Sequence, residues 1–483
     1  MEEKQSMKRT KIVCTMGPNE DDYELMYKMC ASNMDVARFN FSHGTHQEQA
    51  ARLDLLRRAA KEANRPIAAL LDTKGPEIRT GLLKDGKKVL LEAGKEITLT
   101  TEECTGTAER VFINYNGLND DVKAGDTILI DDGLIGLRVI SVDGADIRCT
   151  IVNGGELGER KGVNVPNVSI HLPDLTDKDI EDIKFGIKEG FDIIAASFVR
   201  SASCIRQIRG LLEEAGASML IIAKIENQEG LDNLDEIIAE ADGIMVARGD
   251  LGVEIEAQYI PHLQKKIIRK CNEAGKVVIT ATQMLDSMIR NPRPTRAEVT
   301  DVANAVYDGT DAVMLSGETA AGKYPFEALS MMADVVENAE KYLHYDKYMN
   351  RDVSDELVGN IANTICASSV TAANELNAVA IITPTISGST ARLISKYRPK
   401  MKILALSPSQ AIVRQMMLYW GVTPIWSRRA ETTDELLDIS MDELKNTMLI
   451  NEGDICVVTS GVLSRAKNST PASATNIMRI MQV

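Results

Sequence analysis

Aromatic residues are scarce in this sequence. They make up 4% of the 483 residues, whereas apolar residues in total reach 44%. The core must therefore be built mainly from aliphatic side chains, which suits the packing of parallel α/β folds. The length is enough for roughly two to four domains with a large core.

Other absences exclude whole classes of protein. No apolar run reaches the ~18 residues of a membrane span, and the charged N-terminus, MEEKQSMKRTK, lacks the apolar segment of a signal peptide. A net charge of −15 without a long basic patch argues against nucleic-acid binding. We therefore expect neither a membrane nor a nucleic acid as partner.

The cysteines show no CxxC pair and no other metal-ligand spacing. Isolated cysteines are typical of reduced thiols, so we expect a cytoplasmic protein. The eight are Cys14, Cys30, Cys104, Cys149, Cys204, Cys271, Cys366 and Cys456.

Eight short apolar runs alternate with helical patterns along the first two thirds of the chain. They begin at Thr10, Met34, Ile67, Asp192, Met219, Gly243, Lys276 and Asp311. Eight β–α units predict an α/β fold of the (β/α)8 or TIM barrel type, in which chemistry sits at the C-terminal ends of the strands. The ends of the runs are polar: Arg38, Asn40, Ser42, Asp72, Thr73, Lys224, Glu226, Asp250, Thr282 and Glu318.

The sequence pattern changes between the third and fourth runs, where short segments of alternating apolar and polar residues are separated by Gly, Asp and Asn. This pattern predicts an inserted antiparallel β-barrel domain over residues 75–171, placed at the rim to act as a lid. The catalytic barrel would comprise residues 1–74 and 172–345. Residues 346–483 predict a smaller C-terminal open α/β domain.

The segment IIAKIENQEG ends an apolar run with Lys224 and Glu226. Side chains two apart on a strand share a face, so the two point to the same side. The next run ends at Gly249-Asp250, which brings a second carboxylate to the same rim. Glu226 and Asp250 can hold a hard divalent cation such as Mg²⁺.

Cations at this rim suit a phosphoryl group, because Lys224, Arg38 and Arg79 can neutralise its charge. Two adjacent strands also supply a set of oxygen ligands that suits a monovalent cation: Asn40, Ser42, Asp72 and Thr73. A metal, a lysine and two arginines around one point indicate phosphoryl transfer.

Seven segments resemble the signature segments of the pyruvate kinase family and occur in the family's order over the barrel and its insert. They are VARFNFSHGTH, LLDTKGPEIRTG, KGVNVPN, AKIENQEG, ARGDLGVE, TATQMLDSM and PTRAEVTDVANAVYDGTDAVMLSGETAAGKYP. The third domain resembles the family's effector domain more loosely. The resemblance implies transfer of the phosphoryl group of phosphoenolpyruvate to ADP, giving ATP and pyruvate in the last step of glycolysis.

The resemblance also implies roles for single residues. Glu226 and Asp250 would bind Mg²⁺ or Mn²⁺, Lys224 would stabilise the moving phosphoryl group and the enolate, and Arg38 would contact the substrate phosphate. The substrate carboxylate would be held by the amides of Gly249 and Asp250 and by the hydroxyl of Thr282. Residues implied to bind K⁺ are Asn40, Ser42, Asp72 and the carbonyl of Thr73. Those implied to reach the nucleotide are Asn40, His43, Arg79 and Lys161.

The implied reaction has two steps. ADP attacks the phosphoryl group in line, and the enolate left behind is protonated at carbon. Thr282 would belong to a proton relay through water, because a hydroxyl by itself is a poor acid.

A possible effector site follows from TPTISGSTAR, where hydroxyls lie between a strand and a helix start that can bind an anion. The hydroxyls are those of Thr385, Ser387, Ser389 and Thr390. The family loop binds the phosphate of an activating sugar phosphate, and an ordinary N-cap loop is the alternative. The last loop, SGVLSRAKNSTPASATNIMRI, lacks the glycine-rich turn common in the family, so the effector stays open; Arg465 and Lys467 are candidates for a second phosphate.

The resemblance further implies a homotetramer with interfaces on the barrel and effector domains. Because the sequence stops at Val483 after one α/β unit, no added phosphohistidine-type domain is expected.

Simpler or different explanations remain open at this point. Lys224 and Glu226 could be a structural ion pair, Asp72 a turn cap, Thr282 a strand residue and His43 a turn residue. A Mg²⁺-dependent barrel lyase or aldolase acting on a pyruvate enolate shares the metal carboxylates, and an inactive metabolite sensor shares the barrel. The lyase would not need Arg79 and Lys161.

Glu77, in GPEIRTG, generates a prediction about K⁺. In the resembled family, a glutamate here accompanies K⁺ dependence, whereas a lysine would supply the positive charge itself. We expect pyruvate formation to fall strongly when K⁺ is replaced by a bulky organic cation, as measured in a coupled assay. Full activity in that buffer would contradict the prediction.

Overall fold

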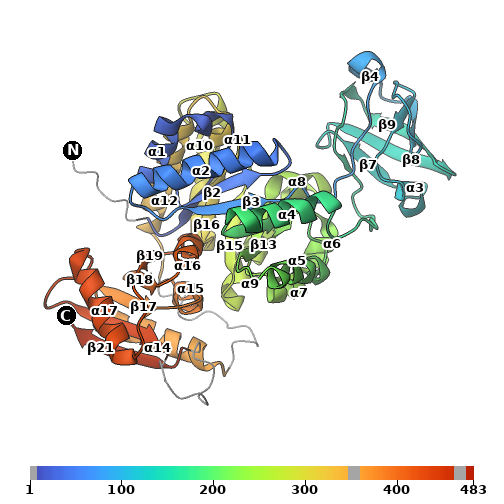
Figure 1. Cartoon of the computed structure of the whole chain (residues 1–483). Coiled ribbons are helices and arrows are strands. Elements are labelled where there is room, and N and C mark those ends of the chain that lie inside the picture. The colour runs from blue at the N-terminus through green and yellow to red at the C-terminus, as the bar shows by residue number, and fades with distance from the viewer. Residues whose placement is uncertain (1–7, 346–358, 462–474) are drawn as a thin grey trace.

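The computed structural model describes residues 8–345, 359–461 and 475–483. Figure 1 shows a central barrel, a separate body of strands on one side of it and a C-terminal domain on the other. No helix in these ranges is both long and apolar enough to cross a membrane.

The central barrel is closed and parallel, in the order β1-β16-β15-β14-β13-β12-β3-β2. Its strands are β1 (Lys11–Met16), β2 (Val36–Asn40), β3 (Ala68–Asp72), β12 (Ile193–Ala196), β13 (Leu220–Ile225), β14 (Gly243–Ala247), β15 (Val277–Ala281) and β16 (Ala312–Leu315). Each falls within one of the eight apolar runs, so the predicted TIM barrel is confirmed. Every residue of β1, β3, β14 and β15 is buried, as expected for strands covered on both faces.

Helices with one apolar face surround the barrel. They are α1 (Tyr23–Ala31), α2 (His46–Glu62), α4 (Asp177–Glu189), α5 (Ala202–Glu214), α7 (Leu234–Glu240), α9 (Ile260–Ala274), α10 (Arg296–Asp308) and α12 (Pro325–Glu340). In α9 the buried positions are Gln264, Ile267, Ile268, Cys271 and Asn272, which are spaced as one helix face. That helix ends at Gly275, whose φ of 65° lies in the left-handed region that glycine adopts without strain.

Aspartates close the base of the barrel in a regular way. Each immediately precedes a strand, namely β2, β12, β14 or β16, and accepts a hydrogen bond of 2.8–2.9 Å from the amide of a residue in the preceding strand of the barrel. The pairs are Asp35 with Ile12, Asp192 with Ala69, Asp242 with Ile221 and Asp311 with Val278. Each carboxylate also forms an ion pair with an arginine. It therefore pairs a backbone amide at the start of a strand and has its own charge neutralised.

The insert after β3 contains β4 (Val89–Leu91), β5 (Glu96–Thr100), β6 (Arg110–Phe112), the short α3 (Leu118–Asp121), β7 (Thr127–Ile130), β8 (Ile135–Asp143), β9 (Asp146–Asn153), β10 (Gly155–Leu157) and β11 (Val163–Asn164). Six strands form the sheet β11-β7-β8-β9-β5-β6, and β10 pairs with β4. The segment around Arg79 and Thr80 bridges both edges, to Gly162 beside β11 and to Ile113 beside β6, which closes the sheet into a small barrel. The exception to the predicted antiparallel pairing is β5 with β6, which run parallel because residues 101–109 cross over instead of forming a hairpin.

The C-terminal domain is an open sheet in the order β19-β18-β17-β20-β21. Its strands are β17 (Ala380–Pro384), β18 (Lys402–Ser407), β19 (Val422–Trp426), β20 (Ile455–Ser460) and the antiparallel edge strand β21 (Ile477–Gln482). Its helices are α14 (Ile361–Glu375), α15 (Ser389–Lys396), α16 (Gln410–Gln415) and α17 (Thr433–Asn446). This is the expected open α/β unit.

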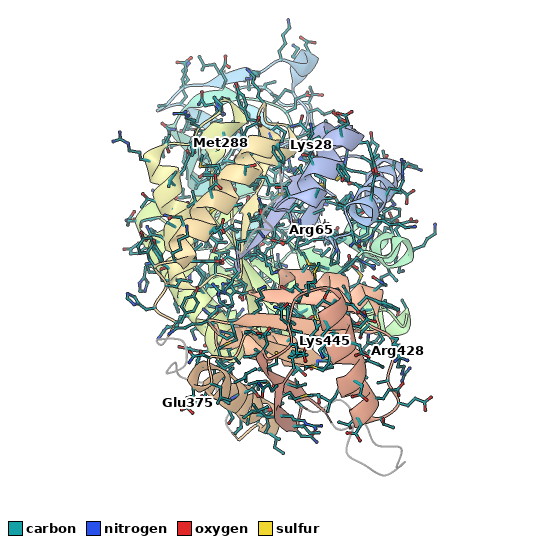
Figure 2. The ribbon with its side chains drawn as sticks, turned by 90° about the vertical axis from the view of Figure 1, so that its left-hand side faces the viewer. Lys28, Arg65, Met288, Glu375, Arg428 and Lys445 are labelled. Atoms are coloured by element: carbon teal, nitrogen blue, oxygen red, sulfur yellow. The ribbon has the colours of Figure 1, made fainter. Side chains whose placement is uncertain are left out.

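The C-terminal domain docks on the base of the barrel, the end opposite the polar strand termini. Arg398 is 2% exposed and donates to Asp311 at 2.7 Å, to Asn272 at 3.0 Å and to the Gly309 carbonyl at 2.8 Å. Arg414 of α16 donates to Asp192 at 2.8 Å. Figure 2 shows this domain below the barrel, with Arg428 and Lys445 labelled on it.

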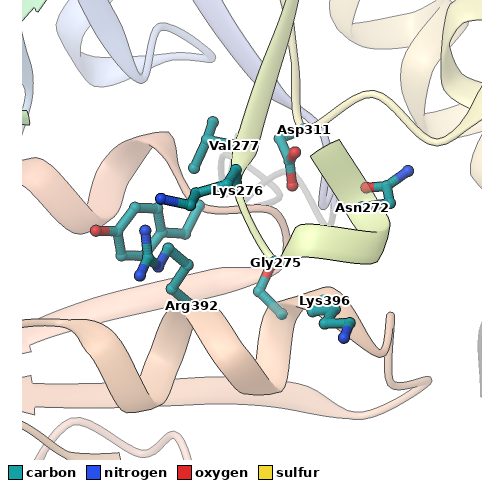
Figure 3. Close-up of a pocket in the computed structure, with 9 residues that line it drawn as sticks. Asn272, Gly275, Lys276, Val277, Asp311, Arg392 and Lys396 are labelled. Atoms are coloured by element: carbon teal, nitrogen blue, oxygen red, sulfur yellow. The ribbon is translucent and has the colours of Figure 1, made fainter. Parts of the chain in front are cut away.

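A small cavity lies at the same junction (Figure 3), where α15 faces the end of α9. Its lining is Asn272, Gly275, Lys276, Val277, Asp311, Arg392, Ser395, Lys396 and Tyr419. It has room for about one water molecule, so it belongs to the packing of the junction.

Replacing Arg398 should destabilise the protein strongly, because Arg398→Met leaves the Asp311 carboxylate buried without its partner. We expect a loss of about 3–5 kcal/mol in the free energy of unfolding, measured by urea denaturation. Arg428, which is exposed in the same domain, provides the control: Arg428→Met should change stability by less than about 0.5 kcal/mol. Equal stability of the two variants would refute the importance of this junction.

Candidate active site

Lys224 lies near the end of β13 and is 8% exposed. Its Nζ is 2.7 Å from the Ser197 hydroxyl, 3.1 Å from Asp72 Oδ1 and 3.0 Å from Glu226 Oε1. Burial alone would lower the pKa of Lys224, but the carboxylates of Asp72 and Glu226 outweigh it and raise that pKa. The lysine is therefore a fixed positive charge at the rim.

Glu226 follows β13 directly, and its carboxylate is on the same side as Lys224, as the spacing predicts. Its Oε2 accepts a hydrogen bond of 2.6 Å from the Phe198 amide. Its Oε1 lies close to Lys224 but accepts no hydrogen bond of good geometry, although it is buried. Burial raises the pKa of Glu226 to about 7, Lys224 opposes this shift, and Asp250 adds to it.

Asp250 lies in the first turn of α8 (Arg248–Glu254), which begins where β14 ends, and its side chain is exposed. Its charge adds to the rise in the pKa of Glu226. A buried carboxylate oxygen that makes an ion pair with Lys224 but accepts no hydrogen bond of good geometry keeps free lone pairs, which fits a hard divalent cation. In the described part of the chain, no three or more His, Cys, Asp or Glu side chains are grouped to hold a metal ion, so Glu226 and Asp250 would supply only two protein carboxylates.

Thr282 follows β15 and packs against Gly249. The threonine has φ 75°, a left-handed conformation that is strained for a β-branched residue. A Cβ on Gly249 would lie 2.7 Å from Thr282 Cγ2, so only glycine fits there. Arg248 donates to the Thr282 carbonyl at 2.6 Å and to Asp301 at 2.7 Å, which holds the strained turn in place.

Arg38, in the middle of β2, is 9% exposed and donates to Asp72 Oδ2 at 2.6 Å and to the Thr15 hydroxyl at 3.0 Å. Burial raises the pKa of Asp72, but Arg38 and Lys224 outweigh it and hold the pKa below its usual range. Asp72 thus fixes the two cations at the rim.

The oxygens expected to bind a monovalent cation come from neighbouring strands, and Asn40 is paired with Asp72 in the register of β2 and β3. Asn40 Oδ1 accepts a hydrogen bond of 3.0 Å from the Ser42 amide. The Thr73 carbonyl accepts one of 2.6 Å from the Ser197 hydroxyl. The set is uncharged apart from Asp72, which suits a weakly charged ion.

The residues of the insert do not join this cluster. Arg79 donates to Glu77 at 2.6 Å and to the Arg160 carbonyl, and Lys161 is 2.9 Å from Asp131. His43, in the exposed turn after β2, has its carbonyl bonded by Gln49. The structure therefore brings Arg38, Asp72, Lys224 and Glu226 into contact, whereas Arg79 and Lys161 lie on the insert and His43 in an exposed turn.

The insert does meet the barrel near Asp250. Asn164 donates to Glu254 at 2.8 Å, and Asp250 and Asp131 both add to the burial that raises the pKa of Asp132. The insert thus lies over α8, the helix that carries Asp250.

The predicted effector loop forms one tight turn before α15. Gly388 donates to the Thr385 hydroxyl at 3.0 Å, Ser387 to that of Ser389 at 3.0 Å, and Thr390 bonds to Thr475 at 2.7 Å. Arg465 and Lys467 lie outside the described residues.

Several contributing residues were not predicted. Ser197 and Phe198 follow β12 and bind Lys224 and Glu226, and Arg248 supports Thr282. They could have been found from the sequence by their position at the end of an apolar run, in SFVR and VARGD. Glu318, to which no catalysis was assigned, accepts the amides of Leu285 and Ser316, a structural use.

Comparisons with known proteins agree over almost the whole chain. Residues 7–329 match the family model "Pyruvate kinase, barrel domain", and residues 363–481 match "Pyruvate kinase, alpha/beta domain". A pyruvate kinase of Staphylococcus epidermidis is 50% identical over 476 residues, which cover 98% of this chain and 80% of that protein. One of Clostridium acetobutylicum is 48% identical over 465 residues, covering 96% and 98%.

The fold agrees as well. The crystal structure of a pyruvate kinase from Cryptosporidium parvum, 39% identical in sequence, covers 100% of this chain and 97% of that one with a TM-score of 0.93. The family models, the relatives and the fold point the same way as the seven segments, and they do not favour a lyase. The chain belongs to the pyruvate kinase family.

Proposed function

We propose that the cluster around Lys224 carries out the pyruvate kinase reaction, transferring the phosphoryl group of phosphoenolpyruvate to ADP to give ATP and pyruvate. The observation that carries the assignment of residues is the buried Lys224 ammonium group between Asp72 and Glu226. Phosphoryl transfer depends on positioning and on stabilising charge, and a fixed cation supplies both.

In the proposed first step, an oxygen of the ADP β-phosphate attacks phosphorus in line, and the bond from phosphorus to the enol oxygen breaks. Lys224 would lie beside the phosphoryl group and the enol oxygen and stabilise the negative charge that moves from one to the other. Arg38, held by Asp72 and Thr15, binds the phosphate of phosphoenolpyruvate. Because both cations share Asp72, they keep a fixed spacing.

Glu226 and Asp250 would hold Mg²⁺ or Mn²⁺, which supplies Lewis-acid stabilisation of phosphoryl and enolate oxygens. The Oε1 of Glu226, which accepts no hydrogen bond of good geometry although it is buried beside Lys224, supports this assignment. K⁺ would be held by Asn40, Ser42, Asp72 and the Thr73 carbonyl, next to the phosphate site.

In the second step the enolate carbon receives a proton. The amides of Gly249 and Asp250 and the Thr282 hydroxyl would hold the substrate carboxylate, and Thr282 would also take part in the relay that delivers the proton. The close approach of Gly249 to Thr282 supports this placement.

The insert would act as a lid over the nucleotide. Arg79 and Lys161 would exchange Glu77 and Asp131 for the ADP phosphates as the lid closes, with Asn40 and His43 on the barrel side. Exclusion of water is the usual use of such a lid. The proposed limits of the lid are residues 75–171, between barrel segments 1–74 and 172–345.

In the C-terminal domain, residues 346–483, a phosphorylated effector would bind the turn of Thr385, Ser387, Ser389 and Thr390. The hydroxyls of Ser387 and Ser389 bond to each other, and that of Thr385 accepts from the Gly388 amide, so an anion could replace those bonds. Titration with fructose bisphosphate, glucose 6-phosphate and AMP distinguishes the ligands. A cytoplasmic location agrees with cysteines that are all reduced and mostly buried.

We propose a homotetramer, and β21 supports one interface of it. This edge strand exposes Met478 and Ile480, and exposed apolar edge strands are prone to pair with another chain. Sedimentation equilibrium should give four times the chain mass of 52.9 kDa. Ile480→Lys should shift the distribution to dimers or monomers, whereas a monomeric wild-type protein would contradict the proposal.

Lys224→Met should lower kcat by about 10³-fold or more, because it removes charge stabilisation that is made in the transition state. Mg²⁺-dependent binding of phosphoenolpyruvate, measured by calorimetry, should be largely retained. Lys188, which is exposed on α4, provides the control, and Lys188→Met should keep normal turnover.

The coupled assay for pyruvate, with and without ADP, completes this test. Unaltered turnover of Lys224→Met would refute the assigned role. Pyruvate formation without ADP would favour a lyase.

A further inference from the structure

The insert is joined to the barrel by two chain segments, here called its legs. The outgoing leg, residues 73–76, leaves β3, and the returning leg, residues 172–176, leads into α4. The side chain of Asp179, in the first turn of α4, hydrogen bonds to the backbone of both legs.

The contacts of Asp179 extend beyond its own helix. It is fully buried, its Oδ1 accepts a bond of 2.9 Å from the Gly75 amide, and its Oδ2 accepts bonds from the amide and hydroxyl of Thr176 at 2.9 and 2.6 Å. Thr176 and Asp179 form a capping box, in which the acidic residue ordinarily serves only its own helix. The equivalent Glu48 of α2 is exposed and bonds only to Thr45, whereas Glu298 of α10, like Asp179, also accepts bonds from another segment, at Ser287.

Gly75 also lies directly against the loop that supports the active site. Its φ is 73°, and a Cβ there would come within 2.8 Å of Ser197 Cβ and 3.0 Å of the Phe198 ring. Ser197 bonds to Lys224, and the Phe198 amide bonds to Glu226. The outgoing leg is thus held on one side by Asp179 and packed on the other against the supports of the two central residues.

We propose that Asp179 is a positioning residue that fixes the pivot of the lid. By holding both legs with one buried carboxylate, it confines lid movement to the chain beyond Gly75 and leaves the loop at Ser197 in place. It also sets the position from which Arg79 and Lys161 reach the nucleotide. This inference rests on the lid role proposed above for the insert.

The informative variant is Asp179→Asn. The asparagine oxygen can keep the cap at Thr176, but its NH₂ group would then face the Gly75 amide, so two donors meet and that link is lost. Thr176→Ala is the matched control, since it removes the hydroxyl from the same box but leaves the bond between Asp179 and Gly75.

Hydrogen exchange followed by mass spectrometry reports on the link itself. Asp179→Asn should speed exchange in peptides that cover Gly75 by about tenfold or more, as expected for an amide that loses its buried acceptor. Thr176→Ala should change exchange only at the start of α4. Equal exchange at Gly75 in wild type and Asp179→Asn would overturn the proposal.

Steady-state kinetics distinguish a role of Asp179 in positioning the lid from a role in stability alone. In Asp179→Asn, the KM for ADP should rise by about tenfold and kcat should fall, because misplaced lid residues serve the nucleotide. The dissociation constant of phosphoenolpyruvate with Mg²⁺ should stay within about twofold, because the barrel cluster is unchanged. Parallel changes for both substrates, or the same changes in Thr176→Ala, would contradict the pivot.

If Asp179→Asn does not fold, Asp179→Glu serves in its place, because the extra methylene prevents one carboxylate from meeting both legs in the same way. Failure of the proposed catalytic roles would be visible separately, as normal turnover in Lys224→Met. That result would leave the exchange measurement at Gly75 unaffected.

Discussion

A buried lysine between two carboxylates is the interaction on which the site depends. Lys224 would lose its charge in an apolar strand end, and Asp72 and Glu226 prevent this. The benefit is mutual, because burying either carboxylate alone would be costly. Asp72 extends the arrangement to Arg38, so one carboxylate orients two cations. The rim is therefore charged but rigid, which is the condition for stabilising a moving phosphoryl group.

The insert differs from the rim, because its cations Arg79 and Lys161 form ion pairs with carboxylates of the insert itself. Arg79 is paired with Glu77, and Lys161 with Asp131. These partly exposed pairs are weak, so a triphosphate or diphosphate can replace the carboxylates at little cost. The strong, buried bonds lie instead at the legs, on Asp179. The cations that would move to the nucleotide are therefore weakly held, whereas the legs of the insert are firmly held.

Much of this could be predicted from the sequence. Barrel strands are covered on both faces, so each is an uninterrupted apolar run, and Lys224 and Glu226 share a face because strand geometry has a period of two. Ser197 could not be predicted as a support, since its role depends on a loop conformation. The parallel pairing of β5 with β6 depends on a crossover that alternation does not record. The pairing of Arg79 with Glu77 likewise depends on how the insert lies.

The aspartates at the base divide the barrel into four similar β–α–β units, here called quarters. Each β–α–β unit carries its own Asp, at 35, 192, 242 or 311, which ties the start of one strand to the next. The base therefore has an approximate fourfold symmetry, whereas the rim has none. Two of the four quarters, those of Asp192 and Asp311, also receive an arginine from the C-terminal domain. The C-terminal domain is therefore anchored to opposite sides of the barrel's circumference, so movement of that domain would act on both sides of the barrel at once.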